Sequence, residues 1–187
     1  MKDFDKIAFI DIETTGLEPH KHEIIEIAVI TVDKTYHVKI SPKFIEFADP
    51  RALEINGYTP EEWIDSIPSN LVASELADLL SNKIIVGHNP KFDMSFIREL
   101  WDVNGCAPYV SSRYIDTVQL AREHLPQCPQ YKLDVIRRYL GWSLVGAHSA
   151  LVDVEDTKRL FHLLWRAGVL RRWWIRLGFR VRSWFSR

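Results

Sequence analysis

Two apolar, β-branched runs near the amino end of the chain restrict its possible folds more than any other part of the sequence. Residues 7–12 (IAFIDI) and 23–32 (EIIEIAVITV) have the composition of buried strands. The link at residues 33–35 predicts a hairpin into a third strand at residues 36–40. Three successive strands of this kind predict an antiparallel sheet at the start of the fold.

The rest of the chain alternates short apolar runs with segments of helical periodicity. Two further strands are expected at residues 84–86 and 114–116, and residues 42–60 are expected to be irregular with short helical pieces. Helices are expected to begin at Thr59 and to span residues 70–80, 90–101, 117–124, 133–140 and 150–165. This order predicts an α/β fold, a mixed β-sheet flanked by helices, and fits a ribonuclease-H-like arrangement.

The composition is ordinary for a soluble globular protein, with 187 residues, of which 47% are hydrophobic and 26% are charged. No apolar stretch approaches the ~18 residues of a membrane-spanning helix, so no transmembrane segment is expected. Cys106 and Cys128 match neither a disulfide framework nor a metal-ligand spacing. We therefore expect two free thiols and a cytoplasmic location, because thiols stay reduced in that compartment.

Charge divides the chain into two parts. All 25 acidic residues precede Arg166, whereas seven arginines and no acid lie from that residue to the end. We expect one domain over residues 1–165 and a basic, tryptophan-rich tail over residues 166–187 that extends the last helix. In such a helix, one face carries the apolar residues Leu163, Ala167, Leu170, Trp174, Leu177 and Val181, and the other side carries Arg172, Arg176 and Arg180, flanked by Arg171 and Arg182. Gly168 and Gly178 weaken this helix by roughly 1 kcal/mol each relative to alanine, so a break is also compatible with the sequence.

Three interpretations of the tail stay open. Its apolar face packs on the domain or on a second copy in a homodimer, as apolar helix faces usually do. Alternatively, its arginines bind phosphates while Trp173, Trp174 or Trp184 stacks on unpaired bases. The third interpretation is attachment to an anionic membrane surface.

Four acidic residues and one histidine stand out by their positions in the expected strands, helices and loops. Asp11 and Glu13 are two apart on the first strand, so their side chains share one face. Asp93 falls in the first turn of a helix, and Asp153 lies in another helix after a loop that carries His148. Taken singly, these positions have ordinary explanations, such as a solvated strand end, favourable charge at a helix N-terminus or an inert surface histidine. Two carboxylates held together, however, repel each other unless a cation lies between them.

Taken together, these segments resemble the three motifs of the DEDDh (DnaQ-like) family of 3′–5′ exonucleases, which includes proofreading subunits of bacterial replicative polymerases. The similar segments are residues 11–17 (DIETTGL) with 24–28 (IIEIA), residues 88–93 (HNPKFD), residues 148–153 (HSALVD) and, more weakly, residues 116–122 (DTVQLAR). The resemblance covers roughly residues 6–165, with all five functional positions in order. The related DEDDy group has a tyrosine four residues before the last aspartate, where this chain has Ser149.

The resemblance implies a metal-dependent exonuclease with two divalent cations, Mg²⁺ or Mn²⁺. It implies that Asp11, Glu13 and Asp153 hold the first ion, that Asp11 bridges to the second, and that Asp93 holds the second largely through water. It makes His148 the general base, because imidazole accepts a proton near neutrality. The expected substrate-binding residues are Thr14, Thr15, Gly16, Leu17, His88, Asn89 and Phe92. Among them, Gly16 permits a close backbone approach and Leu17 can wedge between terminal bases.

The expected substrate is a single-stranded 3′ end, with DNA favoured over RNA because the Thr14-Thr15-Gly16 segment is similar to that of proofreading and repair relatives. An exoribonuclease acting on RNA or short oligoribonucleotides is the alternative, because the same chemistry cuts both. A nucleic-acid-binding module without catalysis is a weaker alternative, because all five functional residues are present. A homodimer and a polymerase partner are compatible with the family but are not specified by the residues.

Overall fold

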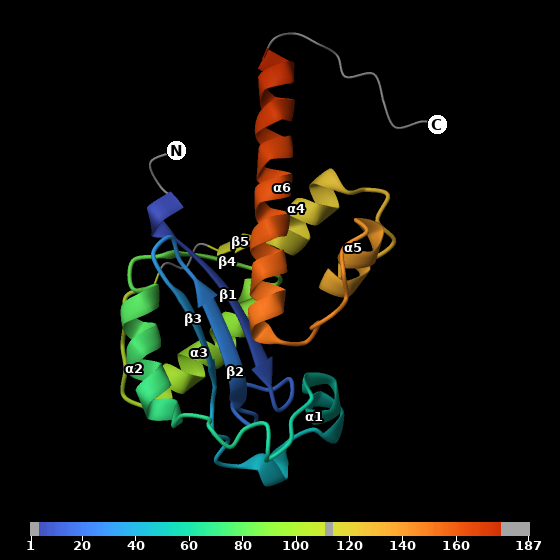
Figure 1. The fold of residues 1–187 in the computed structure, drawn as a ribbon. Coiled ribbons are helices and arrows are strands. Elements are labelled where there is room, and N and C mark those ends of the chain that lie inside the picture. The colour runs from blue at the N-terminus through green and yellow to red at the C-terminus, as the bar shows by residue number, and fades with distance from the viewer. Residues whose placement is uncertain (1–3, 111–113, 177–187) are drawn as a thin grey trace.

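The computed structural model of the chain describes residues 4–110 and 114–176, which form one mixed sheet with helices on both faces (Figure 1). The strands are β1 (Ile7–Thr14), β2 (Ile24–Ile30), β3 (Thr35–Lys39), β4 (Ile84–Gly87) and β5 (Tyr114–Asp116). Their order in the sheet is β3-β2-β1-β4-β5. The pairs β1–β2 and β2–β3 are antiparallel, and the pairs β1–β4 and β4–β5 are parallel. The predicted mixed sheet is thereby confirmed.

The helices cover the sheet unequally. They are α1 (Pro50–Asn56), α2 (Ser69–Leu80), α3 (Pro90–Val103), α4 (Thr117–His124), α5 (Leu133–Tyr139) and α6 (Ala150–Arg176), with short 3-10 turns η1 (Phe4–Lys6) and η2 (Ile45–Phe47). One face of the sheet packs against α2 and α3, and the other packs against α6. The helices α4 and α5 pack on α6 rather than on the sheet, through a cluster that includes Ala121, Ile136 and Leu160.

Side-chain alternation along β1 explains this layering. Ala8, Ile10 and Ile12 belong to the core beneath α2 and α3, whereas Ile7 and Phe9 belong to the core beneath α6. Burial of such aliphatic side chains contributes about 1.5–3 kcal/mol each. A central strand that is apolar on both faces is therefore fixed firmly in register, and so are the side chains that follow at its end.

One expectation about the helices needs correction. The helix expected to begin at Thr59 is only a turn, in which the Trp63 amide donates to the Thr59 carbonyl at 3.2 Å and the Glu62 amide donates to the Thr59 hydroxyl at 3.2 Å. The chain cannot continue helically there, because the Trp63 indole is buried with its N–H on the Ile25 carbonyl and Ile67 then bridges to Ile40.

The helix α6 runs from Ala150 to Arg176 and passes through Gly168 without a break. Its last core residue in the described part is Leu164, so the helix extends well past the body that it covers (Figure 1). Residues 177–187 lie outside the described residues, and with them Leu177, Gly178, Arg180, Val181, Arg182 and Trp184 of the expected tail. Among the described residues, no helix is both long enough and apolar enough to cross a bilayer.

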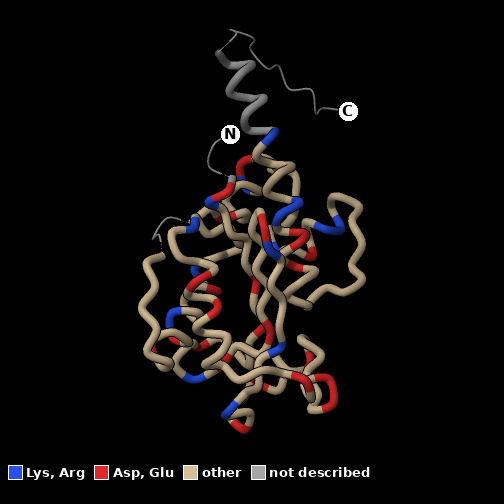
Figure 2. The backbone as a smooth tube through the Cα atoms, turned by 60° about the vertical axis from the view of Figure 1, so that its left-hand side comes forward, with Lys and Arg blue, Asp and Glu red and all other residues tan. Residues whose placement is uncertain are grey.

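Acidic positions lie on the central strands as well as in the surrounding loops (Figure 2). The central strands therefore carry charged groups, which an ordinary core strand avoids.

The two cysteines, Cys106 and Cys128, are free, as expected.

Candidate active site

Asp11 and Glu13 continue the face of β1 that begins with Ile7 and Phe9 and lies beneath α6. The strand register shifts between Glu13 and Thr14, which ends regular pairing with β2 at this point. The apolar half of the strand is buried, while both carboxylates remain partly accessible where the strand ends. The first motif thus presents its two acids as the sequence predicted, together and on one face.

Asp153 and Asp93 reach the same place from two different helices. Asp153 lies in the first turn of α6, and one oxygen from each of Asp11, Glu13 and Asp153 lies within 4.8 Å of the others. Asp93 lies in the first turn of α3, which follows β4, and its carboxylate accepts a hydrogen bond from the backbone of Ile12. Because β1 and β4 are parallel, their carboxyl ends meet, and this brings the second motif beside the first.

Burial raises the pKa of all four carboxylates, and neighbouring acids of the cluster add to this for Asp11 and Glu13. Burial, followed by the charges of Asp93, Asp153 and Glu13, raises the pKa of Asp11 well above its usual range. Burial, then Asp153, Glu26 and Asp93, raise the pKa of Glu13 to about 8. Burial raises the pKa of Asp93 to about 7 against two backbone hydrogen bonds that lower it. Burial also raises the pKa of Asp153, although Arg137 opposes this.

This arrangement fits divalent cations. The three converging groups are hard carboxylate oxygens, which Mg²⁺ and Mn²⁺ prefer. Burial, and after it the charges of the neighbouring acids, raises the pKa of Asp11 and Glu13, and a cation between the carboxylates would offset both effects. Asp11 and Asp93 interact electrostatically, so a second ion beside the first has ligands available.

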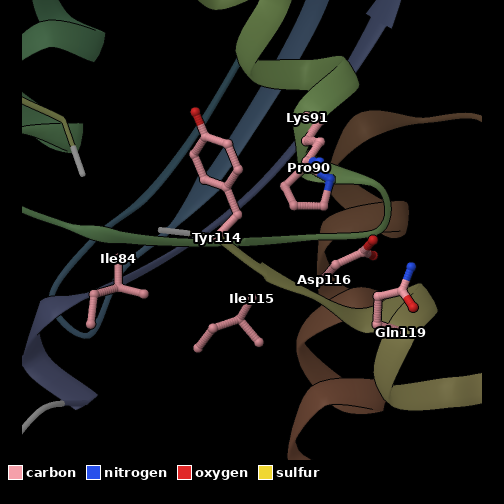
Figure 3. Close-up of a pocket in the computed structure, with 7 residues that line it drawn as sticks. All are labelled: Ile84, Pro90, Lys91, Tyr114, Ile115, Asp116 and Gln119. Atoms are coloured by element: carbon pink, nitrogen blue, oxygen red, sulfur yellow. The ribbon is translucent and has the colours of Figure 1, made fainter. Parts of the chain in front are cut away.

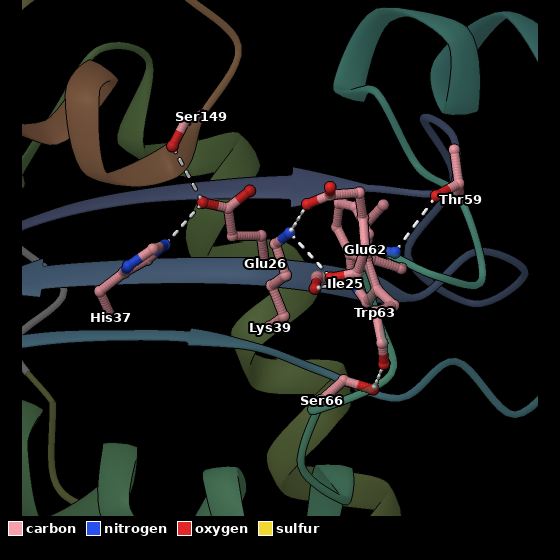
Figure 4. A network of polar contacts seen from close by, with 9 residues as sticks. All are labelled: Ile25, Glu26, His37, Lys39, Thr59, Glu62, Trp63, Ser66 and Ser149. Atoms are coloured by element: carbon pink, nitrogen blue, oxygen red, sulfur yellow. Dashed lines mark hydrogen bonds and ion pairs between the residues drawn. The ribbon is translucent and has the colours of Figure 1, made fainter. Parts of the chain in front are cut away.

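A fifth carboxylate, Glu26, lies next to this group on β2. It faces Glu13 directly across the antiparallel pair, and only 4% of its side chain is exposed. Its Oε1 accepts from the Ser149 hydroxyl at 3.1 Å and lies 2.7 Å from His37 Nε2 (Figure 4). Ser149 adjoins His148, so Glu26 fixes the start of α6 to the sheet beside the acid cluster.

Arg137 on α5 lies behind Asp153 and is fully buried. Its guanidinium donates to Asp153 Oδ1 at 2.8 Å, to Asp156 Oδ2 at 2.6 Å and to Asp134 Oδ1 at 3.2 Å. Burial opposes its charge, but hydrogen bonds and charge from Asp153 and Asp156 outweigh this and raise the pKa of Arg137. Asp153 of the acid cluster is thus held by a buried guanidinium.

His148 lies in the loop that leads into α6, with 44% of its side chain exposed. Its Nε2 lies 3.4 Å from Asp134 Oδ2, and its φ of 66° is left-handed. A non-glycine residue in that conformation is uncommon and is often found at functional sites. The structure therefore places the predicted histidine near the acids on an accessible loop, beside Asp134.

The loop after β1 is shaped by its own threonines. The Thr14 hydroxyl donates to the Gly16 carbonyl at 2.6 Å, and the Thr15 hydroxyl accepts from the Glu23 amide at 2.8 Å. A Cβ on Gly16 would lie 2.4 Å from the His22 ring, so a larger residue here would force that ring to move. Leu17 projects from the loop with 77% exposure. The threonine side chains therefore support the loop, and Leu17 is its accessible apolar group.

The other predicted substrate-binding residues, His88, Asn89 and Phe92, lie in the second motif. His88 is engaged on both ring nitrogens, with Nε2 2.8 Å from the Tyr131 carbonyl and Nδ1 2.9 Å from the Thr117 hydroxyl. Burial lowers the pKa of His88. Asn89 adopts a left-handed φ of 73°, and Phe92 packs on Phe96 with ring centroids 5.0 Å apart. His88 thus holds the second motif to the start of α4 and to the loop that carries Tyr131.

Two grooves adjoin the second motif and share Asp116 and Gln119. One, of about 710 Å³, lies between the start of α3 at Pro90 and Lys91 and the junction of β5 with α4 (Figure 3). The other is lined by polar groups that include Asn89, Arg122, Gln130 and Lys132. Asp116 joins them, because its Oδ1 accepts from the amides of Val118 at 2.8 Å and Asn89 at 3.1 Å.

Sequence reasoning did not single out Glu26, Asp134, Arg137 or Asp116 as site residues. For Glu26 a signal existed, because it is a lone acid in an otherwise aliphatic strand whose residues are all buried. For Arg137 and Asp134 there was none, since charged residues three apart on a short helix usually lie on a solvated face.

The chain is similar to known proteins in sequence and in fold. The family described as Exonuclease matches residues 8–161. The DNA polymerase III PolC-type of Thermotoga petrophila is 34% identical over 165 residues, covering 84% of this chain and 12% of that protein. The DNA polymerase III PolC-type of Staphylococcus aureus (strain MW2) is 29% identical over 167 residues, covering 86% of this chain and 11% of that protein. The chain therefore spans only about a tenth of the length of these relatives.

Solved structures of Escherichia coli exonuclease I share the fold. Its complex with a dT13 oligonucleotide superposes with a TM-score of 0.73 at 21% identity, covering 92% of this chain and 42% of that one. Its zinc-bound complex with single-stranded DNA superposes with a TM-score of 0.71 at 23% identity, covering 86% of this chain and 42% of that one. The expected ribonuclease-H-like fold is thereby confirmed.

Proposed function

The chain belongs to the exonuclease family, and on that premise we propose that it releases nucleoside monophosphates from the 3′ ends of single-stranded DNA. The observation that carries the proposal is the convergence of Asp11, Glu13 and Asp153, with Asp93 beside them and His148 on the adjoining loop. A site of this kind suits hydrolysis of a phosphodiester, which needs an activated water and stabilisation of a charged leaving oxygen.

The carboxylates divide into two sets of ligands. Asp11, Glu13 and Asp153 would hold one divalent cation, Mg²⁺ or Mn²⁺, and Asp11 with Asp93 would hold a second. When bound, such a pair supplies a nucleophilic water at neutral pH and compensates the charge that develops on the leaving oxygen. The acids themselves lose their excess protons on binding, because the cations supply the missing counter-charge.

His148 accepts the proton of the attacking water on an imidazole nitrogen. Its loop position and partial exposure give it access to the acid cluster, and it interacts electrostatically with Asp153. Asp134 faces Nε2 and can hold the ring during proton transfer. General-base action by a positioned histidine typically accounts for about 10²–10⁴ of the rate.

The 3′ end would be held with little regard to base identity. Exposed Leu17 wedges against the terminal base, while Gly16 and its threonine-bonded loop bring the backbone close to the sugar. Arg122 and Lys132 in the adjoining polar groove provide cations for the phosphodiester backbone. DNA is favoured because the relatives are named as DNA polymerases and the exonuclease I complexes contain oligodeoxynucleotides.

A cytoplasmic location agrees with the free thiols.

Parallel digestion of 5′-labelled DNA and RNA of one sequence tests the proposal. We expect a ladder of products that shorten from the 3′ end, a faster rate on DNA than on RNA, and complete loss with a chelator. A 3′-phosphorylated DNA serves as the matched control, because it alters only the end that the site must accept. Products that shorten from the 5′ end, or activity that survives the chelator, would overturn the proposal. A faster rate on RNA would reassign the substrate to oligoribonucleotides.

A further inference from the structure

Arg137 is the most buried charged group of the described chain that the chemistry above does not use. It is 0% exposed, yet it comes from α5, a helix that supplies none of the metal ligands. Its three partners come from two elements, with Asp134 on its own helix and Asp153 and Asp156 on α6. One guanidinium therefore joins the two helices on the side of the site away from the sheet.

Stability alone does not explain such a group. A buried ion pair often contributes no more than apolar residues of similar volume, because the loss of hydration offsets the attraction between the charges. The surroundings are apolar, since α4, α5 and α6 share a cluster that includes Ile136, Leu160 and Leu164. What the guanidinium provides beyond packing is direction, because its donors are fixed in one plane.

The three contacts differ in their relation to the site. Asp153 Oδ1 receives one donor, which fixes the rotamer of a metal ligand and leaves its remaining lone pairs for an ion. Asp134 Oδ1 receives another, while its Oδ2 faces His148 Nε2. Asp156 receives the third and is not part of the acid cluster around Asp11 and Glu13.

We propose that Arg137 is a positioning residue that sets the metal ligand Asp153 and, through Asp134, the histidine His148 in one fixed relation. The proposal rests on the function proposed above for Asp153 and His148. One donor of the guanidinium holds Asp153, the proposed metal ligand, and another holds Asp134, which faces His148, the proposed base. We call these two contacts the metal arm and the base arm. Because both arms start from the same rigid plane, one guanidinium sets the position of the ligand Asp153 and of Asp134 beside the base. Groups that orient metal ligands in this way commonly change metal affinity or activity by 10–100-fold when replaced.

Three conservative variants separate the arms. Arg137→Lys keeps the charge but cannot reach three carboxylates, so we expect Mn²⁺ affinity measured by calorimetry and kcat on a short DNA each to fall by about 10–100-fold. KM for the DNA should stay unchanged. Asp134→Asn cuts only the base arm, so kcat should fall by about 10-fold or more with Mn²⁺ affinity unchanged. Asp156→Asn is the matched control, because it removes the negative charge from the partner of Arg137 that lies outside the acid cluster.

For Asp156→Asn we expect a lower unfolding midpoint but kcat and Mn²⁺ affinity close to the unmodified protein. Equal losses in Asp156→Asn and Arg137→Lys would overturn the proposal, because the effect would then follow stability. Unchanged kcat and Mn²⁺ affinity in Arg137→Lys would overturn it as well. If the unmodified protein shortens no 3′ end, the proposed function fails, yet Mn²⁺ calorimetry still decides whether Arg137 positions Asp153. Arg137→Met provides the same measurements should the lysine variant not fold.

Discussion

Glu13 on β1 and Glu26 on β2 are direct partners across the antiparallel pair, so two carboxylates share one face of the sheet. Like charges directly opposite each other destabilise a strand pair. Here the negative charge of Glu26 helps to raise the pKa of Glu13. Contacts with Ser149 and His37 hold the Glu26 side chain in place beside Glu13. A residue outside the converging acids therefore raises the pKa of one carboxylate among them.

Glu26→Gln should lower the pKa of Glu13, because it removes one of the charges that raise it. Glutamine still accepts from Ser149, so the start of α6 should keep its place. Carbon-13 NMR titration of the carboxyl groups in the metal-free protein gives the pKa directly. Glu62→Gln is the control, since Glu62 is exposed and pairs with Lys39 on the same sheet. An unchanged Glu13 titration in Glu26→Gln would contradict the electrostatic link.

The stability of the metal-free protein should fall as pH rises. The folded pKa values of Glu13, about 8, and Asp93, about 7, lie above the ordinary values of 4.5 and 3.8 for these side chains. The folded state therefore binds more protons than the unfolded state between these limits. The stabilising contribution is complete below about pH 4 and is lost as pH rises through 7 and 8. The slope is at most about 1.4 kcal/mol per pH unit for each group.

Urea unfolding at pH 5, 7 and 9, with chelator and with Mg²⁺, checks this dependence. We expect stability in chelator to decrease from pH 5 to pH 9, and Mg²⁺ to stabilise most at pH 9, where the acids need a counter-charge most. A stabilisation by Mg²⁺ that is equal at pH 5 and pH 9 would show that the ion does not displace protons from these carboxylates.

Asp11→Asn should abolish turnover without harming the fold. Asp11 interacts with Asp93, Asp153 and Glu13, so it is the acid shared by both proposed ion positions. Neutralising it relieves repulsion, and the metal-free unfolding midpoint should be equal or higher. Single-turnover rates in saturating Mg²⁺ provide the measurement. A rate like that of the unmodified protein would remove Asp11 from the metal site.

His148→Ala should reduce the single-turnover rate by about 10²–10⁴ and leave Mn²⁺ binding largely intact. The side chain is 44% exposed and is not among the converging ligands, so its loss should change stability little. If His148 takes the proton of the attacking water, the variant should also lose the part of the pH–rate profile that depends on a general base. Full activity with the same pH profile in the variant would make His148 a bystander.

The parts of this site that could be predicted are those encoded locally. Asp11 and Glu13 follow from alternation on a buried strand, and Asp93 and Asp153 follow from their places in first helical turns. Their convergence was inferred from family motifs, because no local pattern states that α6 crosses the end of β1. The strands and most helices were likewise predictable from apolar periodicity, with ends shifted by one to a few residues.

The parts that could not be predicted depend on contacts between distant elements. The segment at Thr59 carries the residues of a helix start, yet burial of Trp63 against Ile25 holds it to a single turn. Arg137 has the sequence context of a surface residue, and only the packing of α5 on α6 buries it among three aspartates. Tertiary contacts override local propensity in both cases.

Deleting residues 168–187 should leave the chemical step on a short, saturating oligonucleotide intact. The last residue of α6 that packs in the described core is Leu164, so the truncated helix keeps its contacts with the body. The deletion removes six of the seven arginines that follow the acidic part of the chain. Without them, long single strands should bind more weakly, and the dependence of affinity on salt should flatten by about 0.7 in log–log slope for each phosphate that the arginines no longer neutralise.

A tail of the same length with glutamine in place of its arginines is the matched control for this deletion. If the tail is a nucleic-acid arm, the glutamine tail should reduce affinity and salt dependence as the deletion does, because the arginines supply the positive charge that meets the phosphates. Equal affinity and equal salt slope for the full-length and truncated proteins would eliminate the arm. A loss of dimer mass in the truncated protein would then assign the apolar face of the tail to a second copy. A loss of binding to anionic vesicles would assign the tail to a membrane surface.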